Sequence, residues 1–202
     1  YAYPRISIPI ILAVSMALLS LLLGILLVHS RKTKEIRVMS ETDALTGLYN
    51  RRAAEDHISR QMQEDGKNPD CVRPLISIDL DKFKQVNDTY GHLEGDALLI
   101  AVADTLRTSV RSYDIVGRIG GDEFVVYLSN VTDRQNAMAV AEKLCQVIRG
   151  LSTMKKEWSN ISASIGISFA DHPDIKMEEL YISADKAMYS AKGNGRDQYQ
   201  TL

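Results

Sequence analysis

The stretch Arg118–Val126, RIGGDEFVV, places two adjacent carboxylates, Asp122 and Glu123, beside a pair of glycines in an otherwise apolar run. A Gly-Gly pair suits a tight turn that requires positive φ, so the run is typical of a β-hairpin. Carboxylates near strand ends are costly to bury without a counter-ion, and Mg²⁺ is usually held by one or two carboxylates together with substrate phosphates. The stretch therefore indicates either a hairpin with a polar tip or part of a metal site.

A second pair of carboxylates lies in LISIDLD, residues 75–81, which alternates as a strand. Its isoleucines and Leu80 face one way, while Asp79 and Asp81 face the other. If the hairpin lies beside this strand, Asp79 and Asp122 meet over one metal ion, and a pair of such ions would activate a hydroxyl and stabilise a pentavalent phosphorus. We prefer Asp79 because it lies further into the strand; a solvated carboxylate is the alternative for either residue. Asp122 and Glu123 should point apart, so we expect their roles to differ.

Helices and strands that alternate along the chain must position these groups. We expect helices at about 50–64, 96–110, 133–149 and 177–191, from apolar residues at helical spacing. We expect strands at 75–81, 115–119, 123–128 and 161–169, with a short one near 198–201. Strands separated by helices, with one central hairpin, predict an α/β domain with a mixed sheet.

The N-terminal segment has a different character. Residues 6–28 are uncharged and almost wholly apolar, which predicts a transmembrane helix rather than a signal peptide or a buried soluble helix. One arginine precedes the span and four basic residues follow it closely, so residues from about 30 onward are expected in the cytoplasm. Residues 1–5 would be an extracytoplasmic stub and residues 29–42 a helical linker. Because the chain opens at Tyr1, we expect it to be the tail of a longer protein with a sensory part outside the inner membrane.

The overall composition excludes some partners. Lys and Arg number 24 against 26 Asp and Glu, so no strong basic field favours nucleic acid as a partner. Cys71 and Cys145 follow no ligand spacing, which favours two inert thiols in a reduced compartment, with a disulfide as the alternative.

Five segments together resemble the GGDEF family of diguanylate cyclases, whose members condense two GTP into cyclic di-GMP. They are DALTGLYNR at 43–51, DLDKFKQVNDTYGHLEGD at 79–96, GGDEF at 120–124, ASIGIS at 163–168 and AMYSAKGNGRD at 187–197. The match covers residues 43–202 in the family's order and spacing. The resemblance implies a single domain with a palm-like mixed sheet flanked by helices, similar to that of class III nucleotide cyclases.

The resemblance also implies a site. A metal ion, Mg²⁺ or alternatively Mn²⁺, would be held by Asp79, the carbonyl of Leu80 and Asp122, with Glu123 as a further ligand or as the base toward the attacking 3′-hydroxyl. The resemblance assigns the remaining substrate contacts to Lys82 and Phe83 (phosphates, through the backbone), Lys84 (charge at the reacting centre), Asn87 and Asp96 (guanine), His92 (substrate), and Lys192 and Arg196 (outer phosphates). Judged without the resemblance to this family, His92 would be a turn residue, and Lys192 and Arg196 would be a C-terminal helix cap. Asp43 and Arg51 would brace the fold, and Arg118 would pair with Asp43.

Two regulatory features follow from the same resemblance. Making a cyclic dinucleotide needs two antiparallel GTP molecules, and one domain holds one of them, so a C₂ homodimer is expected. Arg111-Ser-Tyr-Asp114 is an RxxD motif five residues before GGDEF, as in members inhibited by their product, and Lys143 is the best match to a further cation. A salt-bridged helix end is the alternative for this motif.

We therefore expect a membrane-anchored diguanylate cyclase of the inner membrane, with its catalytic domain in the cytoplasm. A catalytically silent module that senses GTP or cyclic di-GMP is the second hypothesis, although every expected metal and guanine position is intact. A cyclase or polymerase-like enzyme that uses one nucleotide is the third, and the guanine-binding pair and the RxxD motif argue against it.

Overall fold

The computed structural model describes residues 16–23, 25, 41–170, 172 and 174–202. The chain divides into two compact units, Tyr1–Ser40 and Glu41–Leu202, which are considered separately. In the first unit, Met16–Leu23 is helical and its leucines are exposed. Within the described residues, no helix combines the length and apolar character that crossing a bilayer requires. The predicted span at 6–28 and the linker at 29–42 lie mostly outside those residues.

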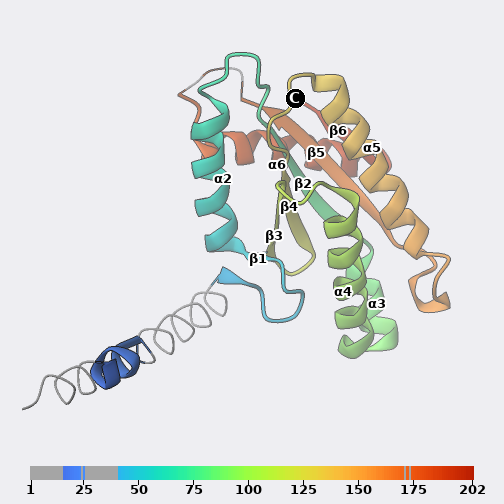
Figure 1. Ribbon diagram of the computed structural model, residues 1–202. Helices are drawn as coiled ribbons and strands as arrows, with labels where there is room; N and C mark the ends of the chain where they lie inside the picture. The colour runs from blue at the N-terminus through green and yellow to red at the C-terminus, as the bar shows by residue number, and fades with distance from the viewer. Residues whose placement is uncertain (1–15, 24, 26–40, 171, 173) are drawn as a thin grey trace, which may run out of the picture. The chain divides into compact units, whose positions relative to one another are not determined.

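The second unit is a six-stranded mixed sheet covered by helices on both faces (Figure 1). Its elements are β1 (Tyr49–Asn50), α2 (Arg51–Asp65), β2 (Pro74–Asp81), α3 (Phe83–Tyr90), α4 (His92–Ser109), β3 (Ile115–Gly120), β4 (Glu123–Tyr127), α5 (Arg134–Leu151), a 3₁₀ turn η1 (Lys156–Trp158), β5 (Ser162–Phe169), α6 (Met177–Gly193) and β6 (Gln198–Thr201). The strand order is β1-β3-β4-β2-β5-β6, with parallel pairs at the two edges and antiparallel pairs between them. The α/β architecture with a mixed sheet is therefore confirmed.

The alternation of β2 separates two cores. Ile76, Ile78 and Leu80 pack with residues of α4 and α5, whereas Leu75 packs with α2 and α6 on the other face. The polar residues of β2 share the face of Leu75, because side chains two apart on a strand point the same way. The sequence prediction that Asp79 and Asp81 face away from the isoleucines is confirmed, and α6 lies over the face that carries them.

Close contact between β5 and α6 depends on Gly166. A Cβ at this position would overlap the backbone of Ala184 and Met188 in α6. The missing side chain lets the helix backbone lie directly on the strand. The same approach brings Met188 Sδ to 3.5 Å from Ser77 Oγ in β2. The position of α6 over the sheet therefore depends on Gly166.

Three elements, α3, β1 and η1, were not predicted from the sequence. Helix α3 occupies FKQVNDTY, where Asn, Asp and Thr have weak helix propensity, and it forms by packing against α4 and η1. Helix α4 begins at His92 rather than near residue 96, so His92 is a helical residue and not a turn residue. Strand β1 has two residues and is too short to show an alternating pattern.

Candidate active site

Three carboxylates lie at the end of β2 and at the start of β4. Asp79 and Glu123 are directly opposite each other across the β2–β4 ladder, which places their Cβ atoms about 5 Å apart on one face. Asp122 precedes Glu123, and its carbonyl oxygen accepts a hydrogen bond from the Leu80 amide at 3.3 Å. Gly121 turns the hairpin with φ +51°, a conformation that favours glycine. The hairpin therefore does lie beside LISIDLD.

The charges of this group interact. Burial raises the pKa of Asp79, Lys192 opposes this shift, and the neighbouring carboxylates Asp122 and Asp81 add to it. Burial likewise raises the pKa of Glu123, and three carboxylates near it, Asp79 first, raise it further. These groups are therefore close enough to repel one another, so a cation at this position would be strongly favoured.

Lys192, in the last turn of α6, is the cation that Asp79 contacts in this structure. Its Nζ lies 2.7 Å from Asp79 Oδ2, and both side chains are largely shielded from solvent. Among the described residues, no three carboxylate, imidazole or thiol groups gather closely enough to form a metal site by themselves. Two carboxylates with the carbonyl of Leu80 nevertheless suit Mg²⁺, which takes its remaining ligands from substrate phosphates and water. The donor set fits a hard divalent ion bound together with a nucleotide.

The expected guanine-binding residues Asn87 and Asp96 lie on α3 and α4, which pack against each other. A Cβ on Gly95 would overlap the amide of Asn87, so the glycine makes room for this side chain beside Asp96. Asp96 is exposed in the first turns of α4, as is His92. An amide and a carboxylate have the acceptors and donors that a guanine edge requires.

The start of α3 follows directly from the end of β2. Lys82 has φ +62° and is the N-cap of the helix, so the first amides of α3 lie two to four residues beyond Asp81. A helix N-terminus favours anions, which suits the phosphate role expected for the backbone at Lys82 and Phe83. Lys82 and Lys84 are both exposed.

The loop after α6 is bound to the second acid of β2. Asp81 is buried and accepts hydrogen bonds from Ser162 Oγ at 2.7 Å and Ser164 Oγ at 2.8 Å, and the Asp197 amide donates to it at 3.2 Å. Arg196 Nε lies 3.7 Å from the same carboxylate. Asp81 is thus not solvated, and the residue opposite it in the sheet is Ser162, whereas Glu123 is opposite Asp79. The partners of Asp81 were not predicted from the sequence.

Arg118 connects the start of the domain to the hairpin turn. Its Nη1 donates to both oxygens of Asp43, at 3.0 and 3.3 Å, and its Nε and Nη2 donate to the Gly121 carbonyl at 3.0 and 2.8 Å. Asp43 also accepts from the amide and hydroxyl of Thr46. The expected pairing of Arg118 with Asp43 is confirmed. Arg51 is exposed and pairs with Glu55 within α2.

The RxxD residues border a separate cavity of about 610 Å³ beyond the C-terminal end of α4. Arg111, Asp114 and Lys143 all line it. Asp114 accepts from the backbone amides of Arg111 and Ser129 at 2.8 and 3.0 Å, and Lys143 Nζ donates to the Ser109 carbonyl at 2.8 Å. Burial raises the pKa of Asp114, and the two amides oppose that shift.

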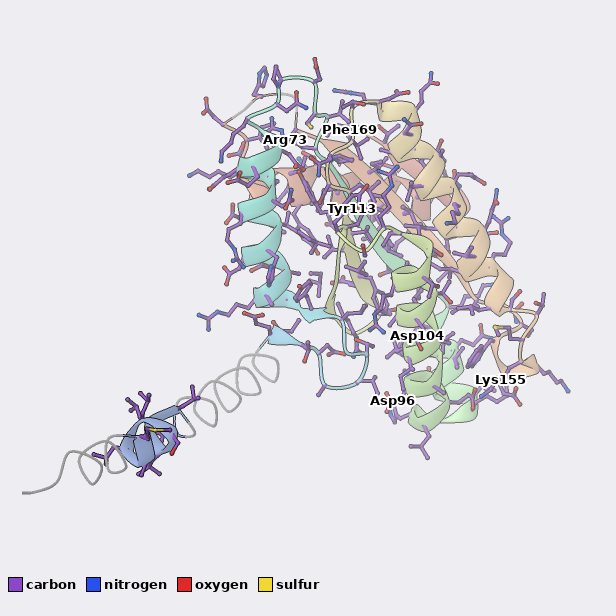
Figure 2. The ribbon with its side chains drawn as sticks, in the orientation of Figure 1. Arg73, Asp96, Asp104, Tyr113, Lys155 and Phe169 are labelled. Carbon is purple, nitrogen blue, oxygen red and sulfur yellow. The ribbon has the colours of Figure 1, made fainter. Side chains whose placement is uncertain are left out.

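The guanine pair and the RxxD motif lie at opposite ends of α4. Figure 2 shows Asp96 at one end of this helix and Tyr113 beyond the other. Eighteen residues of α-helix span about 27 Å. The structure brings together Asp79, Leu80, Asp122, Glu123 and Lys192 at one site. Strand β3, Ile115–Gly120, lies between the RxxD motif and the hairpin turn of this site.

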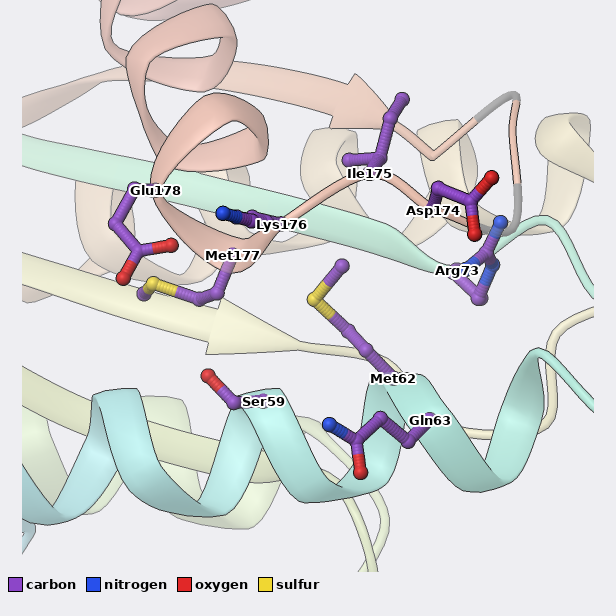
Figure 3. A pocket seen from close by; sticks show the side chains of 9 residues that line it. All are labelled: Ser59, Met62, Gln63, Arg73, Asp174, Ile175, Lys176, Met177 and Glu178. Carbon is purple, nitrogen blue, oxygen red and sulfur yellow. The ribbon is translucent and has the colours of Figure 1, made fainter.

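A further pocket of about 320 Å³ lies between α2 and the start of α6 (Figure 3). Met62, Ile175 and Met177 supply its apolar lining, and Arg73 borders it. It lies at the end of α6 opposite to Lys192, so it does not belong to the carboxylate site.

One residue near the carboxylates was missed by sequence reasoning. Asp185 of α6 raises the pKa of both Glu123 and Tyr181 through its charge. It precedes Lys192 by two turns, so both residues lie on the α6 face toward Glu123. Helical spacing from Lys192 was the only signal that pointed to it.

Comparison with known proteins shows where this arrangement recurs. The family model described as "Diguanylate cyclase, GGDEF domain" matches residues 40–198. The chain is 39% identical over 170 residues to the bifunctional diguanylate cyclase/cyclic di-GMP phosphodiesterase MucR of Pseudomonas aeruginosa, a match that covers 84% of this chain and 24% of MucR. It is 34% identical over 175 residues to the diguanylate cyclase DgcS of Shewanella oneidensis, covering 86% of this chain and 57% of DgcS. The chain thus spans less than two thirds of these relatives.

A solved structure has the same fold. The GGDEF domain of DgcB from Caulobacter crescentus, in complex with c-di-GMP, superimposes with a TM-score of 0.72 and 26% identity. The superposition covers 80% of this chain and 95% of the DgcB domain.

Proposed function

The chain belongs to the diguanylate cyclase GGDEF-domain family, and we propose that it condenses two GTP molecules into cyclic di-GMP with release of two pyrophosphates. The main support is the convergence of Asp79, Asp122 and Glu123 at one end of the sheet, beside Lys192. Such a site binds a triphosphate through charge and leaves a carboxylate free to accept a proton.

The reaction consists of two identical transfers. The 3′-hydroxyl oxygen of one GTP forms a bond to the α-phosphorus of the other, the bond from that phosphorus to the bridging oxygen breaks, and pyrophosphate leaves. The hydroxyl proton passes to Glu123, which lies directly opposite Asp79 across the β2–β4 ladder. Lys192 and Arg196 hold the leaving phosphates, and Lys84 offsets charge at the reacting centre. Asn87 and Asp96 orient the guanine.

A divalent ion completes this site in the proposal. Asp79, the carbonyl of Leu80 and Asp122 would hold Mg²⁺, or Mn²⁺ in its place, with Glu123 next to them. Bound there, the ion neutralises phosphate charge and polarises the phosphoryl oxygens. Lys192 would then move from Asp79 to the phosphates, because the ion replaces it as the counter-charge.

The proposal requires two copies of the chain. Each domain presents one set of metal and guanine residues, and each GTP must receive the hydroxyl of the other. We therefore propose a C₂ homodimer with the two GTP molecules antiparallel across the axis. A chain that forms cyclic di-GMP as a verified monomer under light scattering would contradict this.

Product inhibition is proposed at the RxxD cavity. Arg111 and Lys143 supply two cations and Asp114 an acceptor at its border, which suits a ligand with phosphates and guanine N–H groups. Arg111→Ala should abolish inhibition by added cyclic di-GMP while it leaves initial rates unchanged, because the cavity lies at the far end of α4. Equal inhibition of the variant and the wild type would refute the assignment.

Anchoring in the inner membrane, with the catalytic domain in the cytoplasm, is also a proposal. It is supported by the uncharged run at 6–28 and the basic residues after it. Expression of the chain with a C-terminal reporter tests it: the chain should remain in carbonate-washed membranes with the reporter on the cytoplasmic side. Recovery in the soluble fraction would refute it.

The activity test uses the purified 202-residue chain with GTP and Mg²⁺, followed by mass analysis of the product. Asp122→Ala should lose at least 100-fold in kcat/KM, as expected when a charge that acts on the transition state is removed. Absence of cyclic di-GMP from a verified dimer would refute the activity, and full activity of the variant would refute the metal role. A cyclic mononucleotide as the product would favour the one-nucleotide alternative.

A further inference from the structure

Two acids of β2 each contact one cation of the segment that ends α6. Asp79 contacts Lys192 and Asp81 contacts Arg196, at 2.7 and 3.7 Å. The two acids differ in surroundings, since the Asp81 side chain is 1% exposed and Asp79 lies nearer the hairpin carboxylates. The proposed function uses Asp79 but gives Asp81 no task.

The turn at Arg196 has an unusual backbone. Arg196 and Asp197 are consecutive non-glycine residues with φ +64° and +49°, directly after Gly195 at +107°. Left-handed conformations are unfavourable for residues with a Cβ and persist only where surrounding contacts hold them. The Asp197 amide donates to Asp81 Oδ2 at 3.2 Å, and Arg149 Nε donates to Asp197 Oδ2 at 2.7 Å.

Asp81 is itself fixed by the sheet. Ser162 Oγ and Ser164 Oγ donate to its two oxygens from β5, the strand next to β2. A buried carboxylate is stable only when its hydrogen bonds are satisfied, and here the partners come from the sheet and from the turn. The Arg196 side chain remains 55% exposed, so its guanidinium stays accessible to a ligand.

We infer that Asp81 is a positioning residue that holds the 195–197 turn in its left-handed conformation and so aims Arg196 at the outer phosphates of the nucleotide. This inference rests on the proposed function, in which Arg196 binds those phosphates. In this inference Asp81 acts through the turn and contacts neither the nucleotide nor the metal ion. Loss of Asp81 should therefore weaken recognition of the triphosphate and leave recognition of the guanosine unchanged.

The test compares two ligands that differ in their outer phosphates. Binding of GMP and of a GTP analogue with an α,β-methylene bridge, which cannot release pyrophosphate, is measured with Mg²⁺ on the 202-residue chain. Asp81→Asn should lower the affinity for the GTP analogue about tenfold, which is at the lower end of the range for loss of a charge-assisted hydrogen bond. The affinity for GMP should change less than twofold. Equal losses for both ligands would overturn the inference, because they would show a general structural role.

A second comparison, made in a chain that already carries Arg196→Met, separates a positioning role of Asp81 from a direct effect of Asp81 on the ligand. In Arg196→Met, Asp81→Asn should cause no further loss of affinity for the analogue, since the group that Asp81 aims is absent. Additive losses would overturn the inference. If Arg196→Met binds the analogue like the wild type, the phosphate role of Arg196 fails and the inference fails with it. A wild-type chain that binds neither ligand would overturn the proposed function first.

Two further variants guard against a folding defect. Ser162→Ala removes one donor to Asp81 and leaves the Asp197 amide in place, so it should give a smaller loss that is again confined to the GTP analogue. Asp133→Asn changes an exposed carboxylate that caps α5 and accepts from the Gln135 amide, and it should leave both affinities unchanged. Thermal unfolding verifies that each variant is folded. If Asp81→Asn is unfolded, Ser162→Ala becomes the deciding variant. Loss of affinity for both ligands in Ser162→Ala would then overturn the inference.

Discussion

Replacing Arg118 with methionine tests the connection between the start of the domain and the hairpin turn. The Arg118 and Asp43 side chains are 13% and 25% exposed, so solvent screens their interaction only in part. A hydrogen bond to a charged group contributes about 1.5–3 kcal/mol, and the Gly121 carbonyl is exposed enough for water to replace its two bonds. We therefore expect a loss of about 2 kcal/mol in the free energy of unfolding, mainly from Asp43.

Thermal unfolding followed by circular dichroism measures this loss. For a domain of this size, about 2 kcal/mol corresponds to a fall in Tm of roughly 4–8 °C. Asp43→Asn and the double variant complete a cycle in which the double variant should lose about 1 kcal/mol less than the sum of the single ones. A Tm within 1 °C of the wild type, or strictly additive losses, would refute the role assigned to this pair.

The stability that Asp43 and Arg118 contribute should decrease as the pH falls below about 4. Burial raises the pKa of Asp43, but the hydrogen bonds from Thr46 and Arg118 outweigh it, so the pKa lies below its usual value of 3.8. A carboxylate with a lowered pKa in the folded state contributes stability above its unfolded pKa and loses it as the pH falls through its folded pKa. The difference in urea midpoint between wild type and Asp43→Asn should be constant from pH 7 to 5 and shrink below pH 4. A difference that grows as the pH falls below 4 would contradict this sign.

Three other substitutions or reactions test the packing. Gly95→Ala should displace the Asn87 amide and therefore raise KM for GTP severalfold. The Tm should change little, because alanine has a higher helix propensity than glycine. An unchanged KM would contradict this. Gly166→Ala should lower stability by about 2–3 kcal/mol in thermal unfolding, because its Cβ meets α6 backbone that cannot move aside; a Tm equal to the wild type would show that α6 can shift. Burial raises the pKa of the Cys145 thiol to about 12, so alkylation at pH 8 should require unfolding, and rapid labelling of the folded chain would refute its burial.

The carboxylate site was predictable from sequence because its signals are local. Alternation in LISIDLD assigns Asp79 to one face, and the glycine pair marks the turn that brings Glu123 opposite it. The pairing of Arg118 with Asp43 followed only from the resemblance, since 75 residues separate them. Both cysteines are free and buried, so the disulfide alternative is wrong.

What could not be predicted depends on contacts between distant segments. Helix α3 has weak intrinsic propensity and exists because Val86 packs into the core beside α4. The burial of Asp81 depends on serines of β5 whose hydroxyls could equally have faced water. From the sequence, a solvated carboxylate was the alternative for Asp79 and for Asp81 alike, and the partners of Asp81 were not predicted, because neither the neighbouring strand nor the left-handed turn can be read from its local pattern.

The central position of β2 has a consequence for how the site moves. This strand pairs with β4 and β5 and is buried along its whole length, so its amides should exchange with solvent only on global unfolding. Gly121 is exposed at the tip of the hairpin, and its turn is held only from the Arg118 side chain and the Leu80 amide among the contacts described, so it should open at lower energy than the strand. The donor set thus has an immobile half on the strand and an adjustable half on the turn. Adaptation of the site to a ligand would accordingly come from Asp122 moving toward Asp79, with the strand as the fixed reference.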